Sequence, residues 1–135
     1  GAYREPASVA YPSKRDVDEN FDKLTDVLIA GALEDGSVMS RLDGRLPPIA
    51  AIASHDALRI DYAKIAAEED GLPKEALEFQ MLYGIRRKMQ EKLVAEGYPV
   101  RIYVPYGTHW YPYFMRRLAE RPANLWFFVS NLLRK

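Results

Sequence analysis

Apolar positions along this 135-residue chain fall into three short runs, each followed by a longer pattern with helical spacing. The runs cover residues 49–54, 78–83 and 100–104, and each is too short to be a buried helix. Small and nearly continuous apolar strands, like the first run, are typical of parallel sheets covered on both faces. The pattern therefore predicts alternating strands and helices, which means parallel α/β architecture.

A long helix is predicted before the first strand, over about residues 13–34. Ser13 and Asp16 stand three positions apart and resemble a capping box at the helix start. Apolar residues recur at helical spacing behind this cap. The expected apolar stripe consists of Val17, Phe21, Leu24 and Leu28.

Each of the first two strands leads into a further predicted helix. Asp56 can cap the second helix, and the sequence from Gly71 to Pro73 breaks the chain after it. The third helix covers residues 85–96, which are rich in good helix formers, and Gly97 is its expected C-terminal cap. The expected apolar face of the second helix consists of Leu58, Tyr62 and Ile65.

The predicted order is one helix, three strand–helix pairs and a closing helix after Pro122. If residues 1–3 end a further strand, the chain holds four βα units, which is half of an eight-fold barrel. An open parallel sheet is the alternative. In both architectures ligands bind at the carboxyl ends of the strands.

Composition excludes several classes of function. The 19 basic and 19 acidic residues balance, so nucleic acid and anionic membranes are not expected as main partners. The chain has no cysteine, which excludes disulfides, thiolate catalysis and Cys-ligated metals. No apolar run reaches the roughly 20 residues that span a bilayer. The start at Gly1 carries no targeting pattern, and we expect a fragment or a processed chain.

A cluster of charged and phenolic side chains follows the third strand. Arg116 and Arg117 lie within one helical turn of Tyr113 before them and Glu120 after them. Two guanidinium groups, an acceptor that orients them and a phenol make a receptor for a small carboxylate or phosphate. Ordinary surface charge is the alternative for an isolated Arg-Arg pair.

Other candidate residues stand at the predicted strand ends. His55 follows Ser54 after the first strand, where a ring nitrogen faces either a ligand or the core. Gln80 is polar inside an apolar strand, so when buried it needs a partner, either backbone or a ligand. Tyr103 ends the third strand, and simple packing is its alternative. No metal site is predicted, because the two histidines have no ligand spacing. Ser54 lacks a nucleophile-elbow setting, and neither common nucleotide-binding loop is present.

Five motifs, in this order and spacing, closely resemble the FAD-dependent proline dehydrogenases of the single-function bacterial type. The resemblance covers essentially the whole chain, and one mild departure is Ser54, where family members usually have threonine. The motifs are Gly1-Ala2-Tyr3-x-Glu5-Pro6, Ala53-Ser54-His55-Asp56, Glu78-Phe79-Gln80-Met81-Leu82-Tyr83-Gly84, Arg101-Ile-Tyr103-Val-Pro105-Tyr-Gly107 and Tyr113-x-x-Arg116-Arg117-x-x-Glu120.

The resemblance implies a distorted (βα)₈ barrel of the TIM type. Residues 1–135 would supply its C-terminal half, from the end of the fifth strand through the eighth helix and a closing helix. It implies oxidation of L-proline to Δ1-pyrroline-5-carboxylate, with hydride passing to FAD and electrons passing on to a membrane quinone. It also implies a cytoplasmic enzyme with at most peripheral membrane association, and pyrroline-5-carboxylate dehydrogenase as a functional partner.

The resemblance also assigns roles to individual residues. Arg116 and Arg117 would pair with the proline carboxylate, supported by Tyr113 and Glu120. Around the pyrrolidine ring it places Tyr3, Leu82 and Tyr103, with Tyr103 as the catalytic residue. The implied flavin contacts are Gly1, Ala2, Ser54, His55 and Gln80.

Some family site residues have no counterpart in this chain. The family's general site also uses a lysine, an aspartate and flavin contacts from the first four strands. We therefore expect the chain to need the N-terminal half of the enzyme and to be inactive alone. Two other readings remain: a non-catalytic βα module that binds carboxylates, and a phosphate-binding barrel enzyme, for which Pro105-Tyr-Gly107-Thr108 is a poor phosphate loop.

Overall fold

The computed structural model describes residues 6, 8–39 and 50–108 of the chain. The chain divides into two compact units, Ser13–Tyr103 and a second unit made of residues 1–12 and 104–135. All helices and strands of the described residues belong to the first unit. The predicted arginine helix and closing helix lie outside the described residues.

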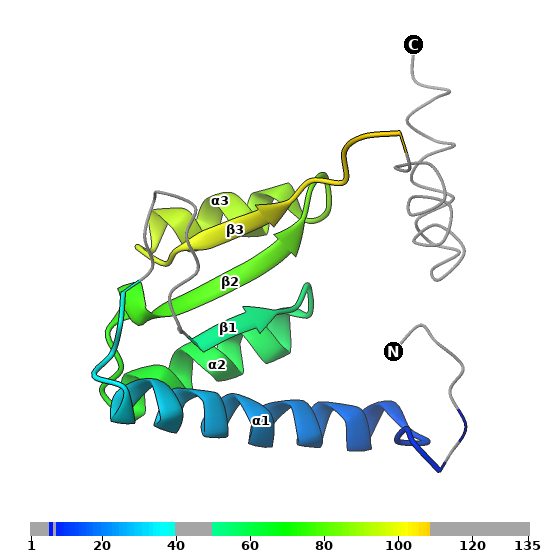
Figure 1. The fold of residues 1–135 in the computed structure, drawn as a ribbon, viewed down its shortest axis with the longest axis horizontal. Coiled ribbons are helices and arrows are strands. Elements are labelled where there is room, and N and C mark those ends of the chain that lie inside the picture. The colour runs from blue at the N-terminus through cyan, green and yellow to red at the C-terminus, as the bar shows by residue number, and fades with distance from the viewer. Residues whose placement is uncertain (1–5, 7, 40–49, 109–135) are drawn as a thin grey trace. The chain divides into compact units, whose positions relative to one another are not determined.

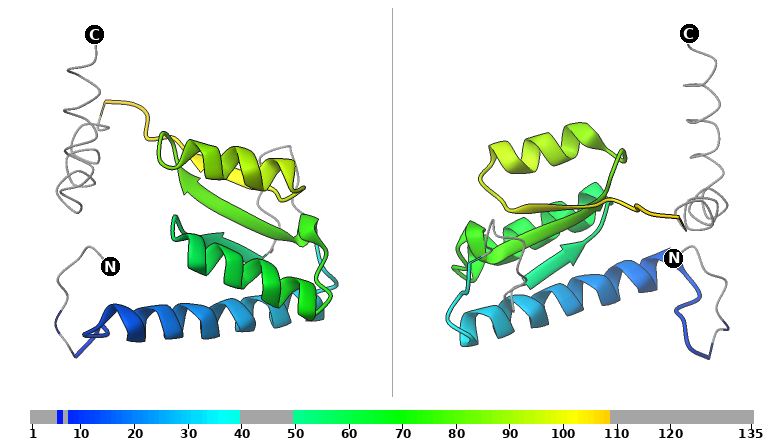
Figure 2. Two further views of the ribbon diagram at one scale, coloured as in Figure 1. Left: turned by 180° about the vertical axis from the view of Figure 1, so that it is seen from behind. Right: turned by 45° about the horizontal axis from the view of Figure 1, so that its top comes forward.

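The first unit is a three-stranded parallel sheet with helices (Figure 1). The strands lie in the order β1-β2-β3, and α2 and α3 cover the same face of the sheet (Figures 1 and 2). This arrangement confirms the predicted parallel α/β class. The elements are α1 (Lys14–Glu34), β1 (Ala50–Ala53), α2 (Ala57–Glu69), the short 3₁₀ helix η1 (Lys74–Ala76), β2 (Leu77–Leu82), α3 (Arg87–Ala95) and β3 (Val100–Tyr103).

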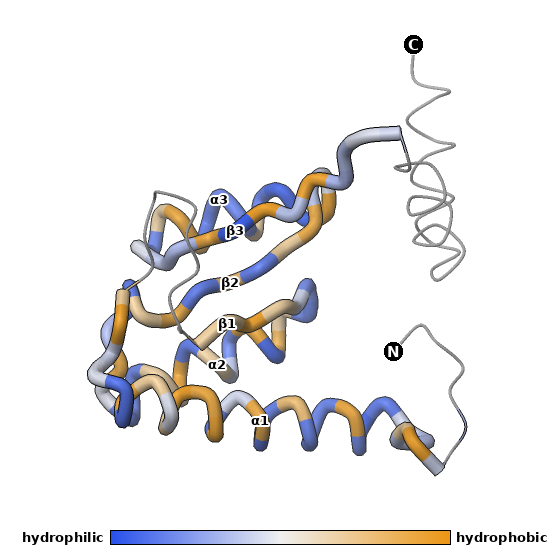
Figure 3. Tube along the Cα trace, in the orientation of Figure 1, coloured by the Kyte–Doolittle hydropathy of each residue, from blue (hydrophilic) through white to orange (hydrophobic). Residues whose placement is uncertain are grey.

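The two faces of the sheet differ in chemistry because successive side chains of a strand point to opposite sides. The face under the helices is apolar and buried, with Phe79 at its centre in edge-to-face contact with Tyr98, 5.3 Å between ring centroids. The opposite face carries polar side chains within β2, and Figure 3 shows these hydrophilic positions along the strand. The strand register places the following residues on this opposite face: Ala51, Ala53, Glu78, Gln80, Leu82, Arg101 and Tyr103.

Local signals for the helix ends are confirmed. The Ser13 hydroxyl accepts the N–H of Asp16 at 3.2 Å, and the Asp56 carboxylate accepts the N–H of Leu58 at 3.0 Å. Gly97 follows α3 with a φ of +92°, which an L side chain rarely adopts. The N–H of Tyr98 then reaches back to the carbonyl of Leu93 at 3.0 Å, which satisfies an orphan carbonyl of the last turn.

The predicted apolar stripe of α1 is wrong at Leu24 and Leu28, whereas Phe21 packs against the buried core as expected and Val17 is partly buried. Leu24 and Leu28 are 54% and 44% exposed, whereas the buried face runs through Thr25, Ile29 and Ala32. Apolar residues occur on more than one side of this helix, as Figure 3 shows, so the sequence pattern fits more than one stripe. The hydroxyl of the buried Thr25 keeps a hydrogen-bond partner, because it donates to the carbonyl of Phe21 at 3.0 Å.

The predicted apolar face of α2 is also wrong. Leu58 and Ile65 are 68% and 56% exposed, and the buried face consists of Ile60, Ala63 and Ala67. Two of these three are alanines, whose small side chains let the helix backbone approach its neighbours closely. Tyr62 lies partly buried toward α1, where its hydroxyl donates to Asp26 at 3.0 Å.

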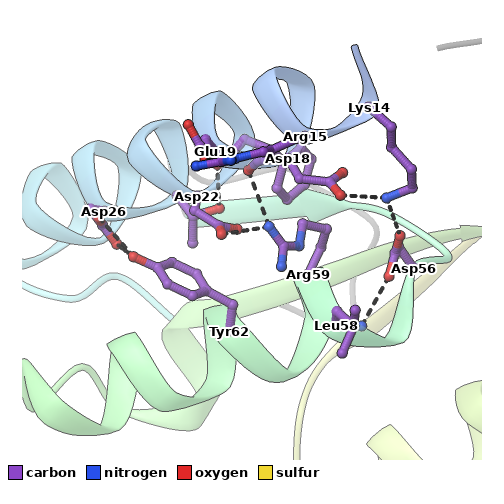
Figure 4. A network of polar contacts seen from close by, with 12 residues as sticks. Lys14, Arg15, Asp18, Glu19, Asp22, Asp26, Asp56, Leu58, Arg59 and Tyr62 are labelled. Carbon is purple, nitrogen blue, oxygen red and sulfur yellow. Dashed lines mark hydrogen bonds and ion pairs between the residues drawn. The ribbon is translucent and has the colours of Figure 1, made fainter.

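A polar network joins α1 to α2 (Figure 4). Arg59 of α2 donates to the Asp22 carboxylate at 2.5 Å and to the Asp18 carbonyl at 3.2 Å. Lys14 pairs with Asp18 and, at 3.3 Å, with Asp56. The contacts recur along α1 at steps of about four residues, so they fix how α2 lies against this helix.

Candidate active site

The predicted substrate residues Leu82 and Tyr103 lie side by side at the carboxyl ends of β2 and β3. They are register partners, on the face of the sheet opposite the helices. The N–H of Tyr83 donates to the Tyr103 carbonyl at 3.0 Å and closes this end of the sheet. The Tyr103 residue is 55% exposed, so core packing does not account for it within the described unit.

The predicted flavin residues Ser54 and His55 follow β1 at the same end of the sheet. Both are partly buried. The Ser54 hydroxyl accepts the N–H of Asp56 at 3.0 Å, which shapes the turn into α2. His55 Nε2 accepts the N–H of Leu82 at 2.9 Å. A contact from His55 to a ligand would therefore use other atoms of the ring.

Gln80 is partly buried, and the partner that the structure shows for it is a side chain, while its contact with a ligand stays a prediction. Its amide nitrogen donates to Glu78 at 2.9 Å. Arg101 of β3 donates two hydrogen bonds to the same carboxylate, from Nε at 2.7 Å and from Nη2 at 2.8 Å. These hydrogen bonds raise the pKa of Arg101 above its ordinary value. Glu78 is only 2% exposed, so its charge needs this two-pronged pairing.

Three residues near the site were missed by sequence reasoning. They are Glu78 and Arg101, which orient Gln80, and Gln90 of α3, whose amide donates to the Leu82 carbonyl at 3.1 Å. The available signal for Glu78 and Arg101 was a polar residue inside an otherwise apolar strand, in Glu78-Phe79-Gln80 and in Val100-Arg101-Ile102. The sequence gives no comparable signal for Gln90, because glutamine is an ordinary helix residue.

The remaining predicted site residues belong to the second unit and lie outside the described residues. They are Gly1, Ala2, Tyr3, Tyr113, Arg116, Arg117 and Glu120. Within residues 6, 8–39 and 50–108, no group of three or more potential metal ligands occurs. No helix in the same residues is long and apolar enough to cross a membrane.

Comparison with known proteins identifies the family. A family model described as proline dehydrogenase matches residues 3–129. The chain belongs to the proline dehydrogenase family. The order β1-β2-β3, with both connecting helices on one face, suits consecutive strands of the family's TIM-like barrel. The resemblance predicted from the five motifs is thereby confirmed.

Three bacterial relatives show the extent of the match. The chain is 46% identical to proline dehydrogenase 2 of Bacillus subtilis strain 168 over all of its 135 residues. It is also 46% identical to the proline dehydrogenase of Deinococcus radiodurans, with 99% of the chain covered. Proline dehydrogenase 1 of the same Bacillus strain is 44% identical over the whole chain. The chain spans 40% of the length of each Bacillus protein and 38% of the Deinococcus protein.

The described residues fit a flavin, the cofactor on which proline dehydrogenases generally depend. The edge of a flavin ring presents both hydrogen-bond donors and acceptors. Gln80 offers both from one carboxamide on the open face of the sheet, and it is only partly buried. Glu78 fixes the orientation of that carboxamide through its contact with the amide nitrogen. The donor set at this end of the sheet therefore suits the cofactor.

Proposed function

We propose that this chain is the C-terminal half of one barrel domain, in an enzyme that oxidises L-proline to Δ1-pyrroline-5-carboxylate with FAD. One observation carries the proposal. Leu82 and Tyr103 lie together at the carboxyl ends of adjacent parallel strands, where barrel enzymes bind their substrates, in a chain that matches the family model over residues 3–129.

Each site residue then has a defined task. Arg116 and Arg117 bind the substrate carboxylate, and Tyr113 and Glu120 orient the two guanidinium groups. Two bidentate donors fix the carboxylate in one position, so the ring carbon is held where it reacts. The residues that surround the ring are Tyr3, Leu82 and Tyr103.

The apolar wall keeps water from the reacting carbon. Leu82 supplies an aliphatic surface, and Tyr103 beside it supplies the larger aromatic one. Exclusion of water strengthens the ion pairs of the carboxylate and prevents side reactions. FAD, when bound, accepts the hydride that the substrate loses. The residues that would hold it are Gly1, Ala2, Ser54, His55 and Gln80.

The proposal extends to partners. Electrons from the flavin pass to a membrane quinone, which requires no more than peripheral contact between a cytoplasmic enzyme and the membrane. The remaining family site residues come from the N-terminal half of the same enzyme. The product is a cyclic imine in equilibrium with an aldehyde, so pyrroline-5-carboxylate dehydrogenase is the expected next enzyme.

Replacement of Arg116 by methionine tests the substrate clamp in the intact enzyme. We expect the KM for L-proline to rise by roughly 100-fold, because a charge-assisted pair to a desolvated carboxylate is lost. Flavin absorbance should be unchanged, because Arg116 has no role at the flavin. Steady-state kinetics with an electron-accepting dye give the measurement.

Arg87→Met is the matched control for this experiment. Arg87 is an exposed arginine whose pair with Glu91, at 2.9 Å, contributes little to stability. Its substitution should leave the KM for proline unaltered. An unchanged KM in Arg116→Met would remove Arg116 from the site. A colourless intact protein that still binds proline would favour the non-catalytic carboxylate-binding module.

A further inference from the structure

The backbone of Leu82 is held from two sides by side chains of other elements. Its N–H donates to Nε2 of His55, which follows β1, at 2.9 Å. Its carbonyl accepts from the side-chain amide of Gln90 on α3 at 3.1 Å. The Leu82 carbonyl also accepts the N–H of Ile85 at 3.3 Å. Among the described residues, the N–H is therefore held by His55 and the carbonyl by Gln90 and the following turn, and neither group is held by a residue of β1.

The sheet explains why these side chains are needed. Odd-numbered residues of β2 turn their N–H toward β3, as the bonds from Phe79 to Pro99 and from Tyr83 to Tyr103 show. The even-numbered Leu82 therefore faces β1. Pairing between β1 and β2 ends where Ala53 meets Gln80, so the ladder does not extend to Leu82. Unpaired backbone groups are costly when they are withdrawn from water, and His55 and Gln90 take the place of a strand here.

Gln90 also holds the loop that follows β2. The same amide nitrogen donates to the carbonyl of Ile85 at 2.8 Å. The loop passes through two left-handed residues, Gly84 at φ +78° and Arg86 at φ +51°. A left-handed conformation is strained for arginine, so the surrounding contacts must hold it. Gln90 thus joins the end of the strand to the start of α3.

We propose that His55 and Gln90 are positioning residues that fix the Leu82 side chain against the ring of the substrate. The inference rests on the proposed function, which places Leu82 at the pyrrolidine ring. Loss of either bond leaves the strand end held mainly from the side of β3, so that Leu82 shifts and its apolar contact with the ring weakens. The carboxylate clamp is unaffected, because its arginines belong to another segment of the chain.

Gln90→Met in the intact enzyme tests the proposal, because methionine keeps the length of the side chain but cannot donate. Inhibition constants against L-proline are measured for cyclopentanecarboxylate, which has carboxylate and ring, and for acetate, which has the carboxylate alone. The variant loses the bonds to both Leu82 and Ile85, and the bond to the Leu82 carbonyl is the one that acts on the ring contact. We expect the first constant to rise about fivefold, the usual effect of losing that one hydrogen bond, and the second to stay constant. The KM for proline should rise together with the inhibition constant for cyclopentanecarboxylate. The kcat should change less, and the flavin content should stay the same.

Glu91→Met is the matched control, since it places the same substitution at the next, exposed position of α3. Both inhibition constants should keep their wild-type values. Equal changes for the two inhibitors in Gln90→Met, or no change for either, would overturn the proposal. If Gln90→Met is not recovered folded, Gln90→Leu removes the donor without adding a charge next to the two carbonyls and is judged by the same criteria.

A double-mutant cycle separates positioning from a merely structural role. Leu82→Ala removes the ring contact directly and sets the size of the full effect. Adding Gln90→Met to Leu82→Ala should raise the cyclopentanecarboxylate constant little further, because the two act through one contact. Fully multiplicative effects would contradict the coupling.

His55 provides an independent arm of the test. His55→Gln places an acceptor oxygen at a similar reach and should restore most of the ratio between the two inhibition constants. His55→Leu has no acceptor and should shift that ratio about fivefold. Equal ratios in the two variants count against His55 as a positioning residue. Failure of the proposed function looks different: the wild-type enzyme itself would then not reduce its flavin with L-proline.

Discussion

The carboxylate of Asp56 accepts hydrogen bonds from two neighbours at once. It accepts the N–H of Leu58 at the start of α2, and it accepts the ammonium of Lys14 from α1 at 3.3 Å. Burial alone would raise the pKa of this carboxyl. The Leu58 N–H and Lys14 outweigh burial and hold the pKa of Asp56 below its ordinary value.

Asp56→Ala should lower the free energy of unfolding of the intact enzyme by roughly 1 kcal/mol at neutral pH, because the helix loses its cap. Asp56→Asn, which still caps, should cost less. The folded-state pKa is lowered, so the stability is present above the unfolded pKa of about 4 and is lost as pH falls through the folded value. Urea unfolding at neutral and acidic pH measures both effects, and a loss that does not shrink on acidification would contradict them.

At the scale of elements, the interface of α1 and α2 holds an ion pair whose hydrogen bonding is incomplete. Asp22 and Arg59 have side chains only 19% and 17% exposed. Burial raises the pKa of Asp22, although the nearby Arg59 guanidinium acts against it. Asp22 Oδ1 and Arg59 Nε have no hydrogen-bond partner in the described part of the chain. The pair therefore fixes the position of the helices more than it stabilises them.

Arg59→Met should destabilise the intact enzyme by about 2 kcal/mol, because it leaves the Asp22 charge partly buried and uncompensated. The double variant Asp22→Leu with Arg59→Met should recover most of the loss, since no charge remains. Thermal unfolding of the two variants gives the comparison. If the double variant were less stable than Arg59→Met, the ion pair would be stabilising on balance, contrary to this account.

At the scale of the whole molecule, the face of the sheet opposite α2 and α3 needs further parts of the enzyme to complete a site. It carries Gln80, Leu82 and Tyr103, together with the paired charges of Glu78 and Arg101. The chain spans 40% or less of the relatives named above. A barrel closes its interior only when all strands are present, because closure removes the sheet edges.

The isolated 135-residue chain should neither bind FAD tightly nor oxidise L-proline. The chain spans 40% or less of the relatives it matches, and the proposed function draws the family's lysine, aspartate and further flavin contacts from the rest of the enzyme. Flavin absorbance after gel filtration and proline-dependent reduction of a dye are the measurements, with the intact enzyme as the positive control. A yellow, active isolated chain would refute this prediction.

The sequence by itself determined the features that depend on near neighbours. Strand positions followed from the runs of apolar residues. The caps at Ser13 and Asp56 and the helix end at Gly97 were predictable because each depends on bonds within a few residues. The five motifs also determined the family. The arginine clamp at Arg116 and Arg117 was predicted in the same way and stays a prediction.

The tertiary structure alone decided what depends on residues far apart in the chain. Apolar residues on several sides of α1 allow more than one buried face, and only packing selected the face through Thr25 and Ile29. Glu78 pairs with Arg101, which lies 23 positions further on, and this pairing holds the carboxylate to which the nearby Gln80 donates. His55, 27 positions before Leu82, became an acceptor for its backbone only because β1 ends before the ladder reaches that residue. Local patterns specify what each segment forms, whereas partners across the sheet exist only once the strands have paired.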